Sequence, residues 1–263
     1  MRLLGYLHLL NLKKLTLFIL ITQLNFSCKE DERLPAEPKL TFEGASLVQK
    51  QSPHDLDIIK FKFFIQDGDG DLGLSYQDLD SPFHEKNYFY RDTGKPITNT
   101  KFKKESIDHH LLVSYRDRLH PPYDTLPLFQ VPYCYYLTNW EIIFNDLNTY
   151  NPEIIDTLYS KENIYFNNLW IDFYTAEADG QLKLFDIKNE FCAVYNGRLP
   201  VLSNDDTADP FEIVTYSRFE SSITYNMKYY DLMFKNKKII IKASVVDRAL
   251  NVSNEIQSTP LQF

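Results

Sequence analysis

Glycine is scarce in this chain, which has 8 glycines among 263 residues. The sequence has no Walker loop, no Gly-x-Ser-x-Gly nucleophile elbow and no His-Glu-x-x-His zinc motif. The adjacent His109 and His110 would point to opposite faces of a strand, so they could not bind one metal ion together. Because no catalytic motif is recognisable, we expect that the protein is not an enzyme.

Positive charge is also in short supply. The chain has 28 Lys and Arg residues against 36 Asp and Glu residues, which gives a formal net charge of −8. Nucleic-acid binding needs clustered Lys and Arg, so we expect no nucleic-acid partner. The same balance argues against electrostatic docking onto anionic lipid. Any association with a membrane should therefore come from an acyl anchor.

Long hydrophobic runs are missing, apart from one near the N-terminus. An apolar segment of about ten residues, Leu15–Leu24, follows the basic residues Arg2, Lys13 and Lys14. This is the length of a signal-peptide core and is too short to cross a bilayer as a helix. The segment predicts a signal peptide, and nothing after it resembles a transmembrane helix.

The apolar segment ends at Ser27-Cys28, with Leu24 four residues before the cysteine. This arrangement resembles the lipobox of bacterial lipoproteins, which implies a signal peptide over residues 1–27 and palmitate-type acylation of Cys28. The following Lys29, Glu30, Asp31 and Glu32 resemble the surface-export signal of Bacteroidota lipoproteins. The resemblance implies an outer-membrane protein that is lipid-anchored and faces the cell exterior.

Cysteine is rare as well, with 3 residues in the chain. If Cys28 is acylated, only Cys134 and Cys192 remain as an internal pair. A disulfide bond between them is chemically allowed outside the inner membrane. Two buried thiols are the alternative, since the sequence gives no distance between these residues. Both readings stay open at this point.

The rest of the chain predicts one β-domain. Residues 28–38 are charged and contain two prolines, which indicates an acidic tether, and residues 39–263 form the domain. Asp57–Gln66 alternates apolar and polar residues, the pattern of a strand with one buried face. Further strands are predicted at Leu126–Leu137, Leu169–Tyr174, Gln181–Ile187, Lys237–Val246 and Glu255–Phe263, whereas Trp140–Leu147 and Phe211–Met233 fit strand or helix. We expect a mainly β protein, an immunoglobulin-like antiparallel β-sandwich with an elaborated middle region.

A motif of alternating acidic residues and glycines follows the first clear strand. Asp67, Asp69 and Asp71 can direct several oxygens at one hard cation. Ser75 and Asp78 fall at the ninth and twelfth positions of an EF-hand-like register, but Leu72 replaces its central glycine. The pattern favours a weak or structural Ca²⁺ site, with no other cofactor required. A solvent-exposed β-turn is the alternative.

A second motif closes the domain. Val245–Asn254 (VVDRALNVSN) resembles the terminal hairpin of bacterial immunoglobulin-like domains, in which an Asp and an Asn-x-Ser link the last two strands. In that topology the preceding strand runs in the same direction as Asp57–Gln66. Asp247 would then lie near the acidic motif, either as a further cation ligand or simply capping its own turn. Arg248 is an alternative partner for the aspartates.

Together these motifs resemble a poorly characterised group of Bacteroidota surface lipoproteins. The resemblance implies a non-enzymatic accessory subunit of an outer-membrane complex for transport, β-barrel assembly or secretion, whose partner is a β-barrel protein. A glycan-binding lipoprotein of a polysaccharide-uptake system is the alternative. Three groups of tyrosines would form aromatic platforms for sugars or for a protein partner; these are Tyr88 and Tyr90, Tyr133, Tyr135 and Tyr136, and Tyr229 and Tyr230.

Overall fold

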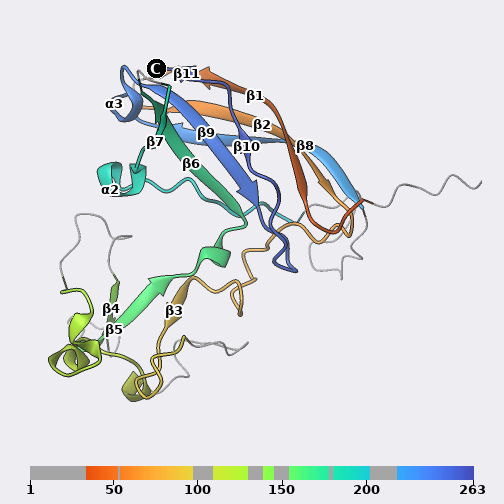
Figure 1. Ribbon diagram of the computed structural model, residues 1–263. Helices are drawn as coiled ribbons and strands as arrows, with labels where there is room; N and C mark the ends of the chain where they lie inside the picture. The colour runs from red at the N-terminus through yellow and green to blue at the C-terminus, as the bar shows by residue number, and fades with distance from the viewer. Residues whose placement is uncertain are drawn as a thin grey trace, which may run out of the picture. The chain divides into compact units, whose positions relative to one another are not determined.

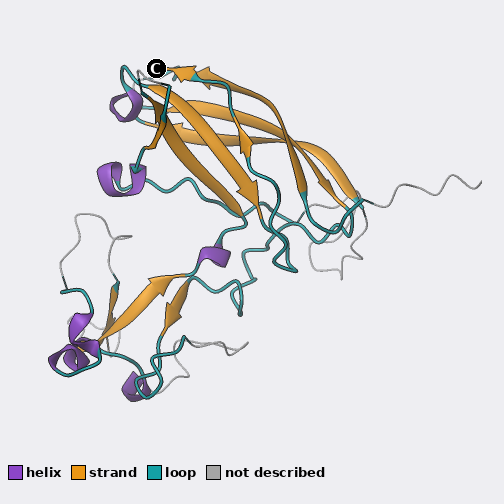
Figure 2. Ribbon diagram, viewed as in Figure 1, coloured by secondary structure: helices purple, strands orange, loops and turns teal. Residues whose placement is uncertain are grey.

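The protein is mainly β, as predicted, and its strands pair antiparallel throughout the part of the chain that is described (Figures 1 and 2). The computed structural model describes residues 34–52, 54–96, 109–129, 139–144, 154–177, 180–201 and 218–263.

The first sheet has three strands in the order β1-β2-β8. They are β1 (Lys39–Val48), β2 (Asp57–Asp67) and β8 (Phe219–Tyr229). β2 is the central strand and pairs along its whole length with β8, from Asp57 opposite Tyr229 to Asp67 opposite Phe219. A register shift in β1 between Phe42 and Gly44 marks a bulge. Because β2 is paired on both sides, its register is fixed over the full strand.

The second sheet has the order β10-β9-β6-β7, and β11 also pairs with β9. Its strands are β6 (Leu169–Ala176), β7 (Leu182–Leu184), β9 (Lys238–Val245), β10 (Ile256–Gln257) and β11 (Leu261–Gln262). The predicted closing strand is thus divided into β10 and β11, which pair with opposite ends of β9. β6 and β9, both rich in apolar residues, form the middle of this sheet.

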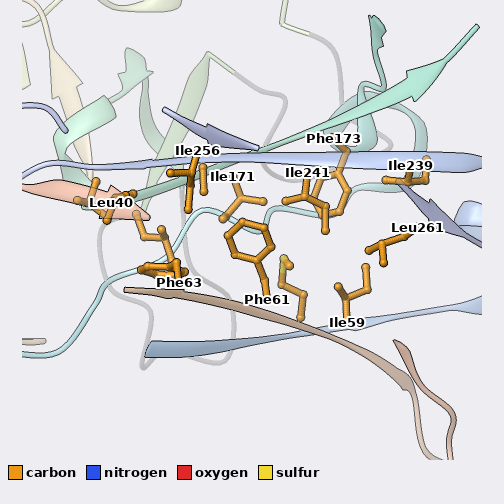
Figure 3. Close-up of a cluster of buried hydrophobic side chains, with 14 of the residues drawn as sticks. Leu40, Ile59, Phe61, Phe63, Ile171, Phe173, Ile239, Ile241, Ile256 and Leu261 are labelled. Carbon is orange, nitrogen blue, oxygen red and sulfur yellow. The ribbon is translucent and has the colours of Figure 1, made fainter. Parts of the chain in front are cut away.

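One hydrophobic core lies between the two sheets (Figure 3). Every second residue of β2 is fully buried, namely Ile59, Phe61, Phe63 and Ile65. These side chains face apolar residues of the second sheet, including Ile171, Phe173, Ile239 and Ile241. The apolar residues that recur at every second position of the sequence are therefore the face of β2 that lies in the core of a sandwich. The immunoglobulin-like topology stays a prediction.

The elaborated middle region contains a small sheet of its own, in the order β3-β5-β4. Its strands are β3 (Lys86–Tyr88), β4 (Trp140–Phe144) and β5 (Ile154–Glu162). Short 3₁₀ helices accompany it: η2 (His109–Leu111), η3 (Tyr115–Leu119), η4 (Tyr123–Thr125) and η6 (Ile164–Phe166). An aromatic cluster around Trp140 and Tyr159 is separate from the main core. We call the residues from Lys86 to Glu162 the insertion.

Two predicted strands differ from the structure. Leu126 and the residues up to Phe129 are irregular, and residues 130–137 lie outside the described part of the chain. β7 is shorter than the predicted Gln181–Ile187, because α2 (Ile187–Phe191) begins there with Asp186 as its N-cap. Phe211–Met233 contains both elements that the sequence allowed, β8 followed by α3 (Asp231–Phe234).

In the described residues, no helix has the length and apolar character needed to span a membrane.

Truncation of the central core residue should test this assignment. We expect Phe61→Ala to lower the free energy of unfolding by about 3–5 kcal/mol, since it removes a fully buried ring and leaves a cavity. Urea denaturation of the purified protein measures this. Leu232→Ala is the matched control, because Leu232 is 74% exposed on α3 and should cost far less. Equal losses for the two variants would contradict the buried face assigned to β2.

Candidate functional site

The strand β2 brings an aspartate into the core. Because alternate residues share a face, Asp67 points to the same side as Phe63 and Ile65. Its side chain is fully buried, with 0% of the residue exposed. The alternation that predicted the hydrophobic face therefore also implied an inward-facing carboxyl at the end of the strand.

The three aspartates of the acidic motif lie together directly after this strand. One oxygen of each of Asp67, Asp69 and Asp71 lies within 4.8 Å of the others. The backbone N–H of Leu72 donates to Oδ2 of Asp67 at 3.0 Å, and Gly70 adopts a positive φ of 71°. The loop thus turns back on itself and directs its carboxyl groups toward one point. We call Asp67, Asp69 and Asp71 the acidic cluster.

The closing hairpin lies against the acidic cluster. The backbone N–H groups of Arg248 and Ala249 donate to the carboxylate of Asp71, and the charge of the buried Asp247 acts on Asp71. Both oxygens of Asp247 also accept hydrogen bonds from Asn251, at 2.7 and 2.8 Å. Asp247 therefore caps its own turn and, at the same time, adds negative charge beside the cluster.

Burial and mutual repulsion act strongly on these carboxyl groups. Burial, with a smaller contribution from Asp69, raises the pKa of Asp67 to about 7. Burial, followed by the charges of Asp247 and Asp69, raises the pKa of Asp71 to about 6. The pKa of Asp247 is raised mainly by burial as well. Each shift means that a negative charge at this place is destabilising without a compensating positive charge.

Two carboxylate oxygens of the cluster lack hydrogen-bond donors. Oδ1 of Asp67 and Oδ1 of Asp71 are both buried and accept no hydrogen bond when the carboxyl groups are ionised. In contrast, Asp57 at the other end of the buried face of β2 accepts a hydrogen bond from the backbone N–H of Lys50 at 2.7 Å. A buried acceptor without a partner is costly, so a proton or a cation is needed here.

The nearby arginine pairs with a different aspartate. Arg248 forms an ion pair with Asp78, with Nη2 and Oδ2 2.5 Å apart. Oδ2 of Asp78 also accepts the backbone N–H of Ser75 at 2.6 Å. Asp78 is thus occupied by Arg248, and Ser75 contributes its backbone to the same interaction. Ser75 and Asp78, which stand at the ninth and twelfth positions of the EF-hand-like register, are thus bonded to each other, and Asp78 is also paired with Arg248.

A second arginine holds the neighbouring loop, and sequence reasoning missed it. The guanidinium of Arg198 donates to the backbone carbonyls of Phe166, Ser75, Asp78 and Phe83, at 2.6 to 3.1 Å. Burial, in turn, lowers its pKa. Nothing in the local sequence signals this role, because the acceptors are main-chain atoms that only the tertiary fold collects.

The start of the domain also reaches the acidic loop. The backbone N–H of Gly68 donates to the carbonyl of Pro35 at 3.0 Å. A Cβ atom at Gly68 would lie 2.2 Å from the carbonyl oxygen of Leu34, so glycine is required for this approach. Leu34 and Pro35, predicted as part of the tether, thus rest on the loop that carries the aspartates.

The other predicted site residues are only partly described. Cys28, Lys29, Glu30, Asp31, Glu32 and Cys134 lie outside the described residues. Cys192, just after α2, is disulfide-bonded, and its predicted pairing with Cys134 stays a prediction. Of the predicted aromatic platforms, Tyr88 and Tyr229 are buried, whereas Tyr230 is 66% exposed. The two pairs that contain these residues therefore do not form continuous exposed surfaces.

The fold and the cluster define an antiparallel β-sandwich with an acidic loop and a closing hairpin that meet. Comparison of the chain with protein-family models, with curated proteins and with solved structures gives no match.

The buried carboxyl of Asp67 predicts a pH dependence in the presence of a chelator. Its folded-state pKa of about 7 exceeds the ordinary value of 3.8, so the folded state favours the protonated form. The associated stability is present at low pH and is lost as the pH rises toward 7. We expect urea denaturation in EDTA to show a smaller loss between pH 5 and pH 8 for Asp67→Asn than for the wild type. Asp80→Asn, at an exposed site, should keep the wild-type slope; equal slopes for all three proteins would contradict the role of Asp67.

Proposed function

We propose that this protein is a non-enzymatic, surface-exposed lipoprotein of the outer membrane that acts as an accessory subunit of an outer-membrane protein complex. The N-terminal motif supports attachment to the membrane. Several acyl chains on Cys28 would hold the domain there firmly, whereas a single chain would not. The partner is a β-barrel protein. In this proposal the sandwich is the scaffold and the insertion is the binding element.

The observation that carries the partner-binding role is the apolar surface of the insertion. Leu111, Leu119 and Leu128 are 55%, 79% and 61% exposed. They lie close in sequence around η3 and η4, whose residues Tyr115 and Tyr123 pack against the aromatic cluster of Trp140 and Tyr159. Exposed apolar residues that gather in one segment are typical of protein-binding surfaces. We call these three residues the leucine surface.

The described residues favour the glycan-binding alternative less. A cleft with a volume of about 380 Å³ lies between the ends of β6, β7 and β9. Its lining is mostly polar and charged, with Glu177, Lys183 and Lys237 among its residues, and its aromatic residue Phe185 is buried. Sugar binding usually relies on exposed aromatic faces, which this cleft does not offer.

Isolation of the complex in mild detergent tests the proposal. We expect the affinity-tagged protein to retain a β-barrel outer-membrane protein in stoichiometric amount, identified by mass spectrometry. The double variant Leu119→Asp/Leu128→Asp should reduce this recovery roughly tenfold or more, since it places charges in the interface. Leu232→Asp is the matched control and should leave recovery and the melting temperature unchanged. Recovery of the protein alone, together with affinity for carbohydrate, would overturn the proposal.

The acidic residues after Cys28 predict the side of the membrane. Replacement of Glu30, Asp31 and Glu32 with alanine should keep the protein membrane-bound but abolish its cleavage by protease added to intact cells. Replacement of the exposed Glu37 serves as the control and should leave cleavage unchanged. If the triple variant remains as accessible to protease as the wild type, these residues do not direct export to the surface.

A further inference from the structure

We infer that the acidic cluster binds one calcium ion, with Asp67, Asp69 and Asp71 as ligands, and that the ion stabilises the contact between this loop and the start of the domain. The inference goes beyond the proposed function and does not depend on it. It rests on the geometry of the cluster, on the buried oxygens without donors and on the mutual repulsion of the aspartates.

The geometry of the cluster suits a single hard cation. Calcium–oxygen distances are about 2.3–2.6 Å, so oxygens on opposite sides of one ion are about 4.6–5.2 Å apart. The 4.8 Å within which the three carboxylate oxygens lie is compatible with these values. All three residues come from one short loop, so one local backbone conformation sets the whole arrangement.

The buried oxygens are the independent sign of a missing ligand. Asp67 is fully buried, one of its oxygens is oriented by the Leu72 N–H, and the other has no donor. Asp71 repeats this pattern, because amides of the closing hairpin donate to its carboxylate while Oδ1 stays without a donor. In metal sites, outer hydrogen bonds orient the ligand groups in this way and leave an oxygen for the ion. A bare surface turn would not bury these oxygens.

The charge balance points the same way. The largest influences on the charges of Asp67, Asp71 and Asp247 are burial, other aspartates and amide groups. A divalent cation would neutralise much of this charge at once.

The donor set favours calcium over magnesium. Magnesium keeps several water molecules and uses one or two carboxylates, whereas calcium accepts six to eight oxygens in variable geometry. Three carboxylates from one loop, with the carboxylate of Asp247 nearby, match the calcium pattern. Exposed Asp69 leaves the outer side of the cluster open to water ligands.

Bound calcium would also order the segment that enters the domain. The N–H of Gly68, between the ligands Asp67 and Asp69, donates to Pro35, so a loop held by an ion would hold Leu34 and Pro35 as well. The domain would then start rigidly at this loop when the ion is bound.

Calcium titration of the detergent-purified full-length protein, stripped with EDTA, tests the inference. We expect 10 mM CaCl₂ to raise the melting temperature by roughly 3–10 °C, for a dissociation constant of about 0.1–1 mM as in extracellular modules. Hydrogen exchange at the Gly68 amide should slow at the same calcium concentrations. MgCl₂ at equal concentration should have a much smaller effect.

Variants identify the ligands. Asp69→Ala should abolish both calcium effects while the protein stays folded, because Asp69 is exposed. Asp80→Ala, which removes an exposed aspartate outside the cluster, should keep both effects. A calcium response that persists in Asp69→Ala, an equal response to magnesium, or no response in the wild type would each overturn the inference. None of these outcomes bears on the partner complex.

Discussion

The register of β2 is the constraint on which the rest of this structure depends. β2 is paired on both edges, and its alternate residues supply the centre of the hydrophobic core. A slip of one residue would move Phe61 and Phe63 to the solvent face, which the hydrophobic effect forbids. The same register holds Asp67 in the interior. The acidic cluster thus begins from a carboxyl that the fold cannot move without losing its core.

The loops after β2 and β9 are organised around the charges that this register creates. Asp71 accepts hydrogen bonds from amides of the closing hairpin, and Asp247 accepts them from Asn251. Asp78 forms an ion pair with Arg248. Arg198 draws four main-chain carbonyls to one guanidinium. Besides the buried Leu72 and Leu74, directed hydrogen bonds and ion pairs order these loops. Only Oδ1 of Asp67 and Oδ1 of Asp71, among the cluster oxygens, are left buried without a donor.

The insertion has an aromatic cluster of its own. Its cluster is held by aromatic contacts, with the rings of Tyr115 and Trp140 5.1 Å apart and those of Trp140 and Tyr159 5.2 Å apart. It exposes Leu111, Leu119 and Leu128, and the rest of the domain also exposes apolar side chains, among them Leu184 and Leu232. In the proposed function the insertion meets the partner, whereas the proposed cation site lies in the loop that follows β2.

The sequence by itself determined the β class, the buried face of β2 and the acidic motif, because a period of two and a run of alternating aspartates are local features. The resemblance of the closing motif to an immunoglobulin-like hairpin implied in addition that Asp247 would come near the acidic motif, through the shared direction of two strands. Only the tertiary structure decided that Asp78 pairs with Arg248 rather than with the cluster, and that Arg198 collects carbonyls from distant segments. These contacts form only where the fold brings distant loops together, because the energy of an ion pair or hydrogen bond depends on the distance between its atoms. The spacing of residues along the chain does not encode that distance.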